Sequence, residues 1–414
     1  MRILVVVVFV LLVMFPVVSC ADDADPAVTL NALFAAVLDN HPSLQASENE
    51  LAAAGAERDA ASWGRFPTLG FDTQVFDGSN SSVLRLEQPL WAGGRIQGQI
   101  DLTAAQEKSA RANMHSVTLQ LLDSTAQAFF DSLRWRARVD IAKNNEQTHR
   151  HLLTMIERRV QAQISPEVDL MLAQSRLNQA SNERLLYEQQ LAGARIALEE
   201  LTALPLPSGL VTPVVPIIEG TQSQWEAYAL QFSPERARLQ ADLEAVDADI
   251  RLAKAQSKPS VVAGHEWRTN NSSDVSSRNQ VYIAIQYEPG AGLSSLGVVR
   301  AAEARRLAAE ARVSEVDRDI RRRVAGLWSE IQSLTLQEPL TRATLSSTEA
   351  TVDSYVRQFQ VGKKSWLDVL NVQREKAQAE FGLADVEAPL LLARLRLMLW
   401  SGQMPLLHGY ANEK

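Results

Sequence analysis

The sequence predicts a mainly α-helical chain with a small β portion, built as two tandem repeats of a strand pair and a long helical hairpin. Three observations support this prediction. Aromatic residues are only 6% of the 414 residues, which is typical of long helices rather than of a compact α/β enzyme. Pro42 and Pro67 are 25 positions apart, and so are Pro234 and Pro259. Each pair of prolines brackets an Ala-rich segment, and two short alternating stretches and a long helical run follow each pair.

The first 20 residues are predicted to be a signal peptide and not part of the fold. Arg2 supplies a positive charge, and the apolar run that follows has 13 residues, too few to span a bilayer. The stretch VVSC ending at Cys20 resembles a bacterial lipobox, which makes Cys20, the single cysteine of the chain, the candidate lipidation site. Ordinary cleavage after Ala21 is the alternative.

The repeats divide the rest of the chain into four parts. We expect the first repeat over residues 28–204 and a linker over 205–221. The second repeat is expected over 222–402, and a C-terminal tail over 403–414. Each repeat would begin with an amphipathic helix, continue with two strands and end with a helical hairpin.

Each repeat contains a helical run of unusual length. Residues 99–165 contain no Gly or Pro, and a helix of this size is about 100 Å long. Its counterpart, near 298–361, contains Gly326 and Pro339, so we expect a kink or a helix junction there. A cytoskeletal-type coiled coil is the alternative, and the signal peptide and the strands argue against it.

Both long runs are interrupted at corresponding places. The stretches are RRVQAQISPEVDLML at 158–172 and RQFQVGKKSWLDVL at 357–370, and in each an Asp follows eleven positions after an Arg. We interpret the breaks as hairpin tips, near 162–166 and near 361–365, from which return helices run back.

Four short segments alternate apolar and polar residues, at 68–76, 82–88, 260–268 and 280–287. Their length is close to the roughly 9–11 residues that a tilted strand needs to cross a bilayer. Strands of a half-buried soluble sheet show the same alternation. Four strands cannot close a barrel, and an open sheet leaves its edge amides unpaired in lipid. If these strands lie in a membrane, several chains must share one barrel, and three chains would supply twelve strands.

Together these features resemble the TolC family of outer-membrane channel-tunnels over about residues 28–405. The local motifs are LEQPLWAGGRI (86–96), YEPGAGLSSLGVVRAAEAR (287–305) and FQVGKKSWLDVLNVQ (359–373). The resemblance implies a homotrimer with a twelve-stranded β-barrel in the bacterial outer membrane and an α-helical barrel across the periplasm. It further implies an export duct that works with a periplasmic adaptor and an inner-membrane ABC exporter or proton-driven pump.

Two segments, QYEPGAGLSSLG and RRVQAQISPEVD, are similar to the branch of this family that serves type I secretion of large adhesins. Multidrug efflux with a proton-driven pump is the alternative. A function of another class is a lipid-anchored periplasmic scaffold or adaptor without a pore, in which the four strands form a soluble sheet.

No enzyme chemistry, cofactor or metal site is expected. His149 and His151 are two positions apart, so on a helix they face different directions and do not suit one metal ion. The stretch GAGLSSLG at 290–297 lacks the Lys-Ser/Thr pair of a P-loop. A formal net charge of −8 and a pI of about 5.4 argue against nucleic acid as a partner.

The resemblance assigns the pore aperture to the hairpin tips. Asp368 matches the aperture carboxylate of the family, and in a trimer three such groups would form a ring that attracts cations. Asn371 stands where the type member of the family has a second carboxylate, which implies a weaker ring. Phe359 and Lys364 match positions that hold the closed state, and Asp169 is expected to pair with Lys364 between neighbouring hairpins.

The alternative is that Ser365 and Asp368 only start the return helix, as its N-cap and as a negative charge in its first turn. The resemblance also places adaptor docking on the tips. The residues concerned are Val361, Gly362, Lys363, Lys364 and Ser365 on the second tip and Ala162, Gln163, Ile164 and Ser165 on the first. The tips are not equivalent, because Gln163 stands where the second tip has Gly362.

Overall fold

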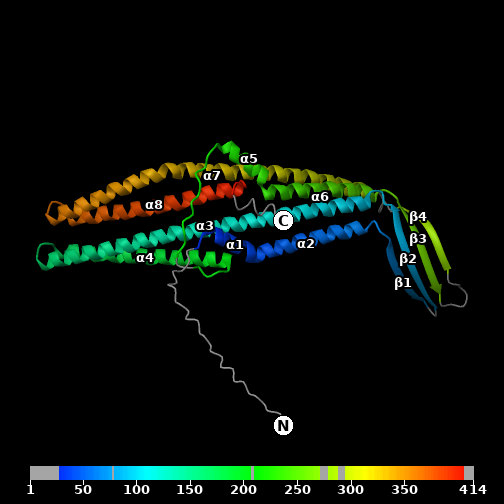
Figure 1. The fold of residues 1–414 in the computed structure, drawn as a ribbon, viewed down its shortest axis with the longest axis horizontal. Coiled ribbons are helices and arrows are strands. Elements are labelled where there is room, and N and C mark those ends of the chain that lie inside the picture. The colour runs from blue at the N-terminus through cyan, green and yellow to red at the C-terminus, as the bar shows by residue number, and fades with distance from the viewer. Residues whose placement is uncertain (1–27, 77–78, 207–208, 271–277, 288–293, 405–414) are drawn as a thin grey trace, which may run out of the picture.

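The computed structural model describes residues 28–76, 79–206, 209–270, 278–287 and 294–404. The described chain is elongated, with a sheet at one end, two helical hairpin tips at the other and long helices between them (Figure 1). The predicted signal peptide, its Cys20, and the tail beyond residue 404 lie outside these ranges.

The elements of the two repeats follow one another in the same order, which confirms the tandem arrangement. The first repeat consists of α1 (Leu30–Asn40), α2 (Pro42–Trp63), β1 (Thr68–Phe76), β2 (Ser79–Trp91), α3 (Arg95–Gln161) and α4 (Glu167–Thr202). The second consists of α5 (Gln222–Phe232), α6 (Pro234–Gln256), β3 (Ser260–Asn270), β4 (Arg278–Gln286), α7 (Ser294–Gln360) and α8 (Trp366–Trp400). Both α3 and α7 have 67 residues, so each is about 100 Å long.

The helix junction that Pro339 led us to expect is not present, because α7 is one continuous helix with Pro339 inside it. A proline within a helix lacks one backbone hydrogen bond, which permits a bend. In Figure 1, α7 changes direction along its length without a break. The expectation of a junction between two helices in this segment was therefore wrong.

The four strands form one antiparallel sheet in the order β1-β2-β3-β4. The central pair joins the repeats, since β2 of the first pairs with β3 of the second in the register Leu86↔His265. One face is apolar, and its residues on the outer strands are 67–75% exposed: Leu69, Phe71 and Val75 on β1 and Val281, Ile283 and Ile285 on β4. Among the residues that the structure describes, neither β1 nor β4 has a strand partner on its outer side.

The opposite face of the sheet carries a polar network centred on β2. Arg85 lies 3.7 Å from Asp72 of β1 and 3.5 Å from Glu266 of β3. The Tyr282 hydroxyl of β4 donates to Glu87 of β2 at 2.6 Å, across the intervening β3. The Tyr282 ring can cross β3 there because Gly264 has no side chain; a Cβ at that position would overlap the ring.

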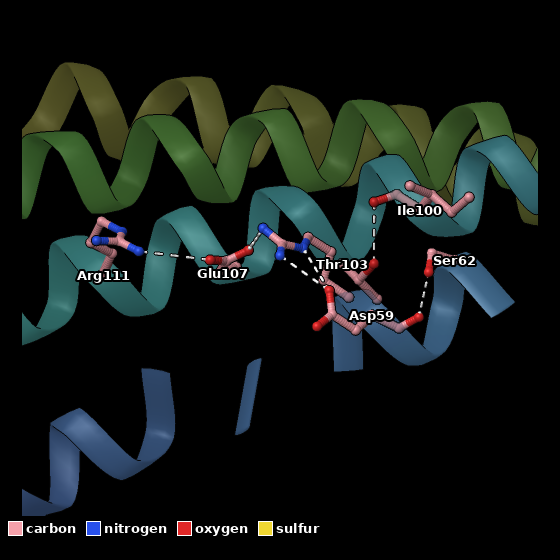
Figure 2. A network of polar contacts seen from close by, with 7 residues as sticks. Asp59, Ser62, Ile100, Thr103, Glu107 and Arg111 are labelled. Atoms are coloured by element: carbon pink, nitrogen blue, oxygen red, sulfur yellow. Dashed lines mark hydrogen bonds and ion pairs between the residues drawn. The ribbon is translucent and has the colours of Figure 1, made fainter. Parts of the chain in front are cut away.

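Next to the sheet, α2, α3, α6 and α7 lie side by side in that order. A row of ion pairs crosses the four helices at one level: Arg58–Glu107 (2.6 Å), Lys108–Glu244 (2.7 Å) and Asp247–Arg306 (2.7 Å). Figure 2 shows the α2–α3 part of this row, with Glu107 between Arg111 on its own helix and the end of α2 that carries Asp59. Exposed ion pairs contribute only about 0–1 kcal/mol each to the stability of a protein. The row therefore serves mainly to align the neighbouring helices along their axes.

Towards the tips, the side-by-side order becomes α4, α3, α8 and α7. The Arg138 guanidinium of α3 links the two hairpins, since it lies 4.5 Å from the Tyr187 ring of α4 and 5.1 Å from the Phe381 ring of α8 and pairs with Asp385. Among the described helices, none has a segment both long and apolar enough to cross a membrane.

We predict that Gly264→Ala disrupts the sheet. The new methyl group would displace the Tyr282 ring and break its hydrogen bond to Glu87, at a cost of about 1–3 kcal/mol. The midpoint of thermal unfolding, followed by the loss of strand signal in circular dichroism, should fall. Gly70→Ala is the matched control on β1, because a Cβ there approaches its nearest neighbour only to 4.0 Å. Equal effects of the two substitutions would contradict the role given to Gly264.

Candidate functional site

The candidate site is the pair of hairpin tips, where α3 turns into α4 and α7 turns into α8 (Figure 1). A buried apolar cluster joins the tips, and each of the four helices contributes to it. Its buried members are Leu152, Leu153 and Ile156 of α3, Ala173 of α4, Phe359 of α7, and Trp366, Val369 and Leu370 of α8. The tips of one chain therefore form one packed unit.

Both long helices end in the same backbone turn. The closing hydrogen bonds run from the Ile164 amide to the Arg159 carbonyl and from the Lys363 amide to the Gln358 carbonyl, each 2.8 Å long. The turn requires one left-handed residue, which is Gln163 (φ 59°) in the first tip and Gly362 (φ 76°) in the second. The predicted difference between the tips therefore lies in the side chains and not in the path of the backbone.

The return helices start differently. On the second tip, the Ser365 hydroxyl accepts a hydrogen bond from the Asp368 amide at 3.2 Å, which confirms the predicted N-cap. The Asp368 carboxylate in turn accepts from the Ser365 amide at 3.1 Å and from its hydroxyl at 2.8 Å. On the first tip, Pro166 occupies the cap position and provides no side-chain hydrogen bond. The Asp368 side chain is thus held in one orientation by the helix start.

The capping contacts also keep Asp368 charged. The hydrogen bonds from the Ser365 hydroxyl and amide lower the pKa of Asp368, and the nearby Lys364 ammonium lowers it further. Each of these contacts favours the ionised carboxylate. A carboxylate that stays ionised in mild acid suits the proposed aperture position.

Phe359 and Lys364 make contacts within the chain. Phe359 is buried, with its ring 5.3 Å from Trp366 and 4.6 Å from the Arg159 guanidinium of the other hairpin. Lys364 places its ammonium 4.1 Å from the ring centre of Tyr355. Phe359 therefore contacts the other hairpin through a cation–π interaction with Arg159.

Asp169 and Lys364 do not form an ion pair with each other within the described part of one chain. An ion pair between them across two neighbouring chains remains a prediction. Asp169 lies in the first turn of α4, and Asn371 lies on α8, three residues after Asp368. Sequence reasoning missed Arg159 and Trp366. A signal was available for Trp366, because it follows Phe359 at a spacing of seven, with only a short turn between them.

The residues expected to dock an adaptor form the outer surface of the tips. Val361 and Ile164 are 69% and 63% exposed, an unusual exposure for aliphatic side chains. Ala162, Gln163, Gly362, Lys363 and Ser365 are exposed as well, and Ser165 and Lys364 are partly exposed. Apolar, cationic and hydroxyl groups thus lie together at the end of the molecule.

The comparison with protein families identifies the class of protein to which the chain belongs. The family described as "Outer membrane efflux protein" matches residues 33–204 and 227–403, which is most of the chain. The chain belongs to the outer membrane efflux protein family. This TolC-like family consists of non-enzymatic channels of the bacterial outer membrane with a periplasmic extension. The predicted class and location are therefore confirmed.

Individual relatives of this efflux protein are distant. The pyoverdine export outer membrane protein OpmQ of Pseudomonas putida is 23% identical over 335 residues, which cover 78% of this chain and 68% of OpmQ. The CusC crystal structure matches with a TM-score of 0.81 at 19% identity, over 90% of this chain and 91% of that one. VceC of Vibrio cholerae matches with a TM-score of 0.79 at 17% identity, over 90% and 96%. At this identity the structures establish the fold alone, and the comparisons give no evidence for the adhesin-secretion branch.

We predict that Gln163→Gly stabilises this efflux protein and that Gly362→Gln destabilises it. Both positions adopt the left-handed conformation, which costs a residue other than Gly about 1 kcal/mol. No atom lies within 4 Å of a Cβ at Gly362, so the cost there comes from the backbone. The midpoint of thermal unfolding should rise for the first variant and fall for the second. A change in the same direction for both would contradict the shared turn.

Proposed function

We propose that three copies of this chain form the exit duct of a tripartite export system, with a β-barrel in the outer membrane and an α-helical barrel across the periplasm. The observation that supports this most directly is that the described strands and helices of one chain form an arc of neighbours that is open at both edges. Its sheet ends in the unpaired strands β1 and β4, and lipid cannot satisfy their outer amides. Three copies, joined β4 to β1, make twelve strands with no edge.

The helices next to the sheet support the same closure through their charges. The edge helices of the arc are α2 and α7. Helix α2 carries four carboxylates and one arginine, whereas residues 294–325 of α7 carry eight arginines and five carboxylates, so the net charges are −3 and +3. The arc therefore presents an acidic edge to the basic edge of the next copy.

The alignment of the helices supports specific partners across this seam. The row of ion pairs places Arg58 of α2 at the level of Arg306 of α7. Glu57 lies beside Arg58, and Arg312 lies within two helical turns of Arg306. Both Glu57 and Arg312 are exposed and have no partner within the described chain. We assign them to opposite sides of the α2–α7 seam.

Nearer the tips, the edge helices α4 and α7 carry exposed aliphatic side chains. They are Val168, Met171, Leu185, Leu186 and Ile196 on α4 and Leu336 and Leu340 on α7, each more than half exposed. Large exposed aliphatic groups on facing edges are typical of subunit interfaces. A second copy would remove these side chains from water.

The tips are proposed to form the aperture and the partner surface. Three Asp368 carboxylates, held by their capping contacts, would ring the narrow end of the duct, with Asn371 as the polar neighbour. Phe359, Lys364 and Asp169 would hold the closed arrangement. The exposed docking residues of both tips would contact a periplasmic adaptor, which connects the duct to an inner-membrane pump.

Two cargo classes are supported by different observations. We favour small molecules driven by an inner-membrane pump, because one relative is named for the export of pyoverdine. The alternative, type I secretion of a large adhesin, rests on the segments QYEPGAGLSSLG and RRVQAQISPEVD. Crosslinking from cysteines placed at 164 and 363 would distinguish the two: capture of a proton-driven pump would support efflux, and capture of an ABC exporter with a peptidase domain would support adhesin secretion. A scaffold without a pore is not proposed, because the chain belongs to a family of channels.

A charge exchange tests the α2–α7 seam. Glu57→Arg places like charges across each seam, at a cost of about 1 kcal/mol per seam, and should lower the temperature at which the trimer dissociates on an unboiled gel. Adding Arg312→Glu restores opposite charges and should recover most of the loss. A double variant as labile as Glu57→Arg alone would contradict this pairing.

The aperture role of Asp368 is tested by selectivity in a planar lipid bilayer. Asp368→Asn keeps an acceptor for the cap but removes the charge, so the channel should lose most of its preference for cations. Asp169→Asn, the matched change on the first tip, should have a smaller effect. Because the pKa of Asp368 is below the ordinary value of 3.8, the wild-type preference should persist as the pH falls towards that value and be lost only below it. Unchanged selectivity in Asp368→Asn would exclude Asp368 from the pore, and absence of conductance in the wild type would contradict the proposed channel.

A further inference from the structure

A cavity of about 600 Å³ lies between α3, α8 and the segment 209–212, away from the tips and the sheet. This segment belongs to the connection that leads from α4 to α5 and crosses the long helices in Figure 1. Phe130, Leu133, Leu390 and Leu391 supply an apolar wall. The volume falls within the range of about 300–1,000 Å³ that is usual for small-molecule sites.

The cavity also contains guanidinium groups with unused hydrogen-bond donors. The Nε atoms of Arg134 and Arg394 are both buried without an acceptor in the described part of the chain, and both residues line this cavity. A terminal nitrogen of the Arg134 guanidinium lies 3.5 Å from a carboxylate oxygen of Asp131, which makes a long ion pair. Arg394 has no hydrogen-bond or ion-pair partner among the residues that the structure describes. A partly buried cation without a counter-charge is costly, so Arg394 is the feature here that requires an explanation.

The acidic residues of the lining do not meet this need. Glu338 and Glu387 both pair with Arg342, at 2.9 and 2.6 Å. Asp140 is exposed at the surface and forms no ion pair in the described chain. Among the described residues, Arg394 is therefore the lining cation that is left without a counter-charge, and it lies on the same helix as the apolar Leu390 and Leu391.

We propose that this cavity binds a small organic anion, in which a carboxylate or phosphate meets Arg394 and an apolar body lies against the leucine side chains. Guanidinium groups are suited to such anions because their donors match two oxygens at once. The site lies on the helical part of the chain and is independent of the aperture. It gives the duct a binding site for a ligand that does not have to pass through the pore.

Calorimetric titration with octanoate, in a neutral maltoside detergent, tests this proposal. Octanoate combines a carboxylate with a short apolar chain, and octanamide is its neutral counterpart. We expect saturable octanoate binding to the wild-type protein and at least about tenfold weaker binding of octanamide. Arg394→Gln should weaken octanoate binding by a similar factor and leave octanamide binding unchanged. The absence of saturable octanoate binding to the wild type would overturn the proposal.

Two further variants separate the site from general effects. Arg374→Gln removes an exposed arginine from the same helix, outside the cavity, and should leave octanoate binding unchanged. Ala388→Phe fills the cavity without changing its charge and should abolish binding of both ligands. Equal weakening by Arg374→Gln and Arg394→Gln would show that octanoate follows net charge, and that result would overturn the proposal. The far-ultraviolet circular dichroism of each variant reports whether it is folded.

Discussion

Backbone amides at the edge of a sheet must find partners, and this requirement governs the architecture. The described part of the chain contains four strands, too few to form a closed barrel, and the outer strands β1 and β4 present apolar side chains on one face. The long helices continue the arc beyond the sheet. Ion pairs between neighbouring helices fix how far each helix is shifted along its axis relative to the next. In our proposal, closure by further copies would satisfy the sheet edges and the helix edges in one step. In this account the acidic α2 edge and the basic α7 edge determine which edges meet.

The tips show how a repeat can diverge while its backbone stays fixed. Both long helices stop in the same turn, yet the first uses Gln163 and the second Gly362 for the left-handed position. The second return helix has a reciprocal cap between Ser365 and Asp368, whereas the first starts at Pro166 without one. The Asp368 carboxylate is thus oriented, and its charge stabilised, by a capping box, which is a common way for a helix to begin. The same geometry serves the fold and, in our proposal, the aperture.

Much of the fold could be predicted from the sequence because its signals are local and repeated. Alternation located all four strands, although β2 extends to Ser79–Trp91, beyond the predicted 82–88, because its ends pair with neighbouring strands. The continuity of α7 could not be predicted, because it depends on packing against α8, which lies beside the Pro339 region and pairs Glu387 with Arg342. Contacts such as Arg159 with Phe359 join residues 200 positions apart and leave no pattern in either segment. The unpaired Arg394 likewise becomes visible only when α3 and α8 lie side by side.

We propose that one chain is an incomplete arc and that three chains complete it. Native mass spectrometry of the protein released from neutral detergent tests this claim most directly, since it counts the copies in the folded assembly. We expect a single species of three chains, which dissociates to monomers only with loss of the folded structure. A stable folded monomer, or a closed assembly with another number of copies, would contradict it.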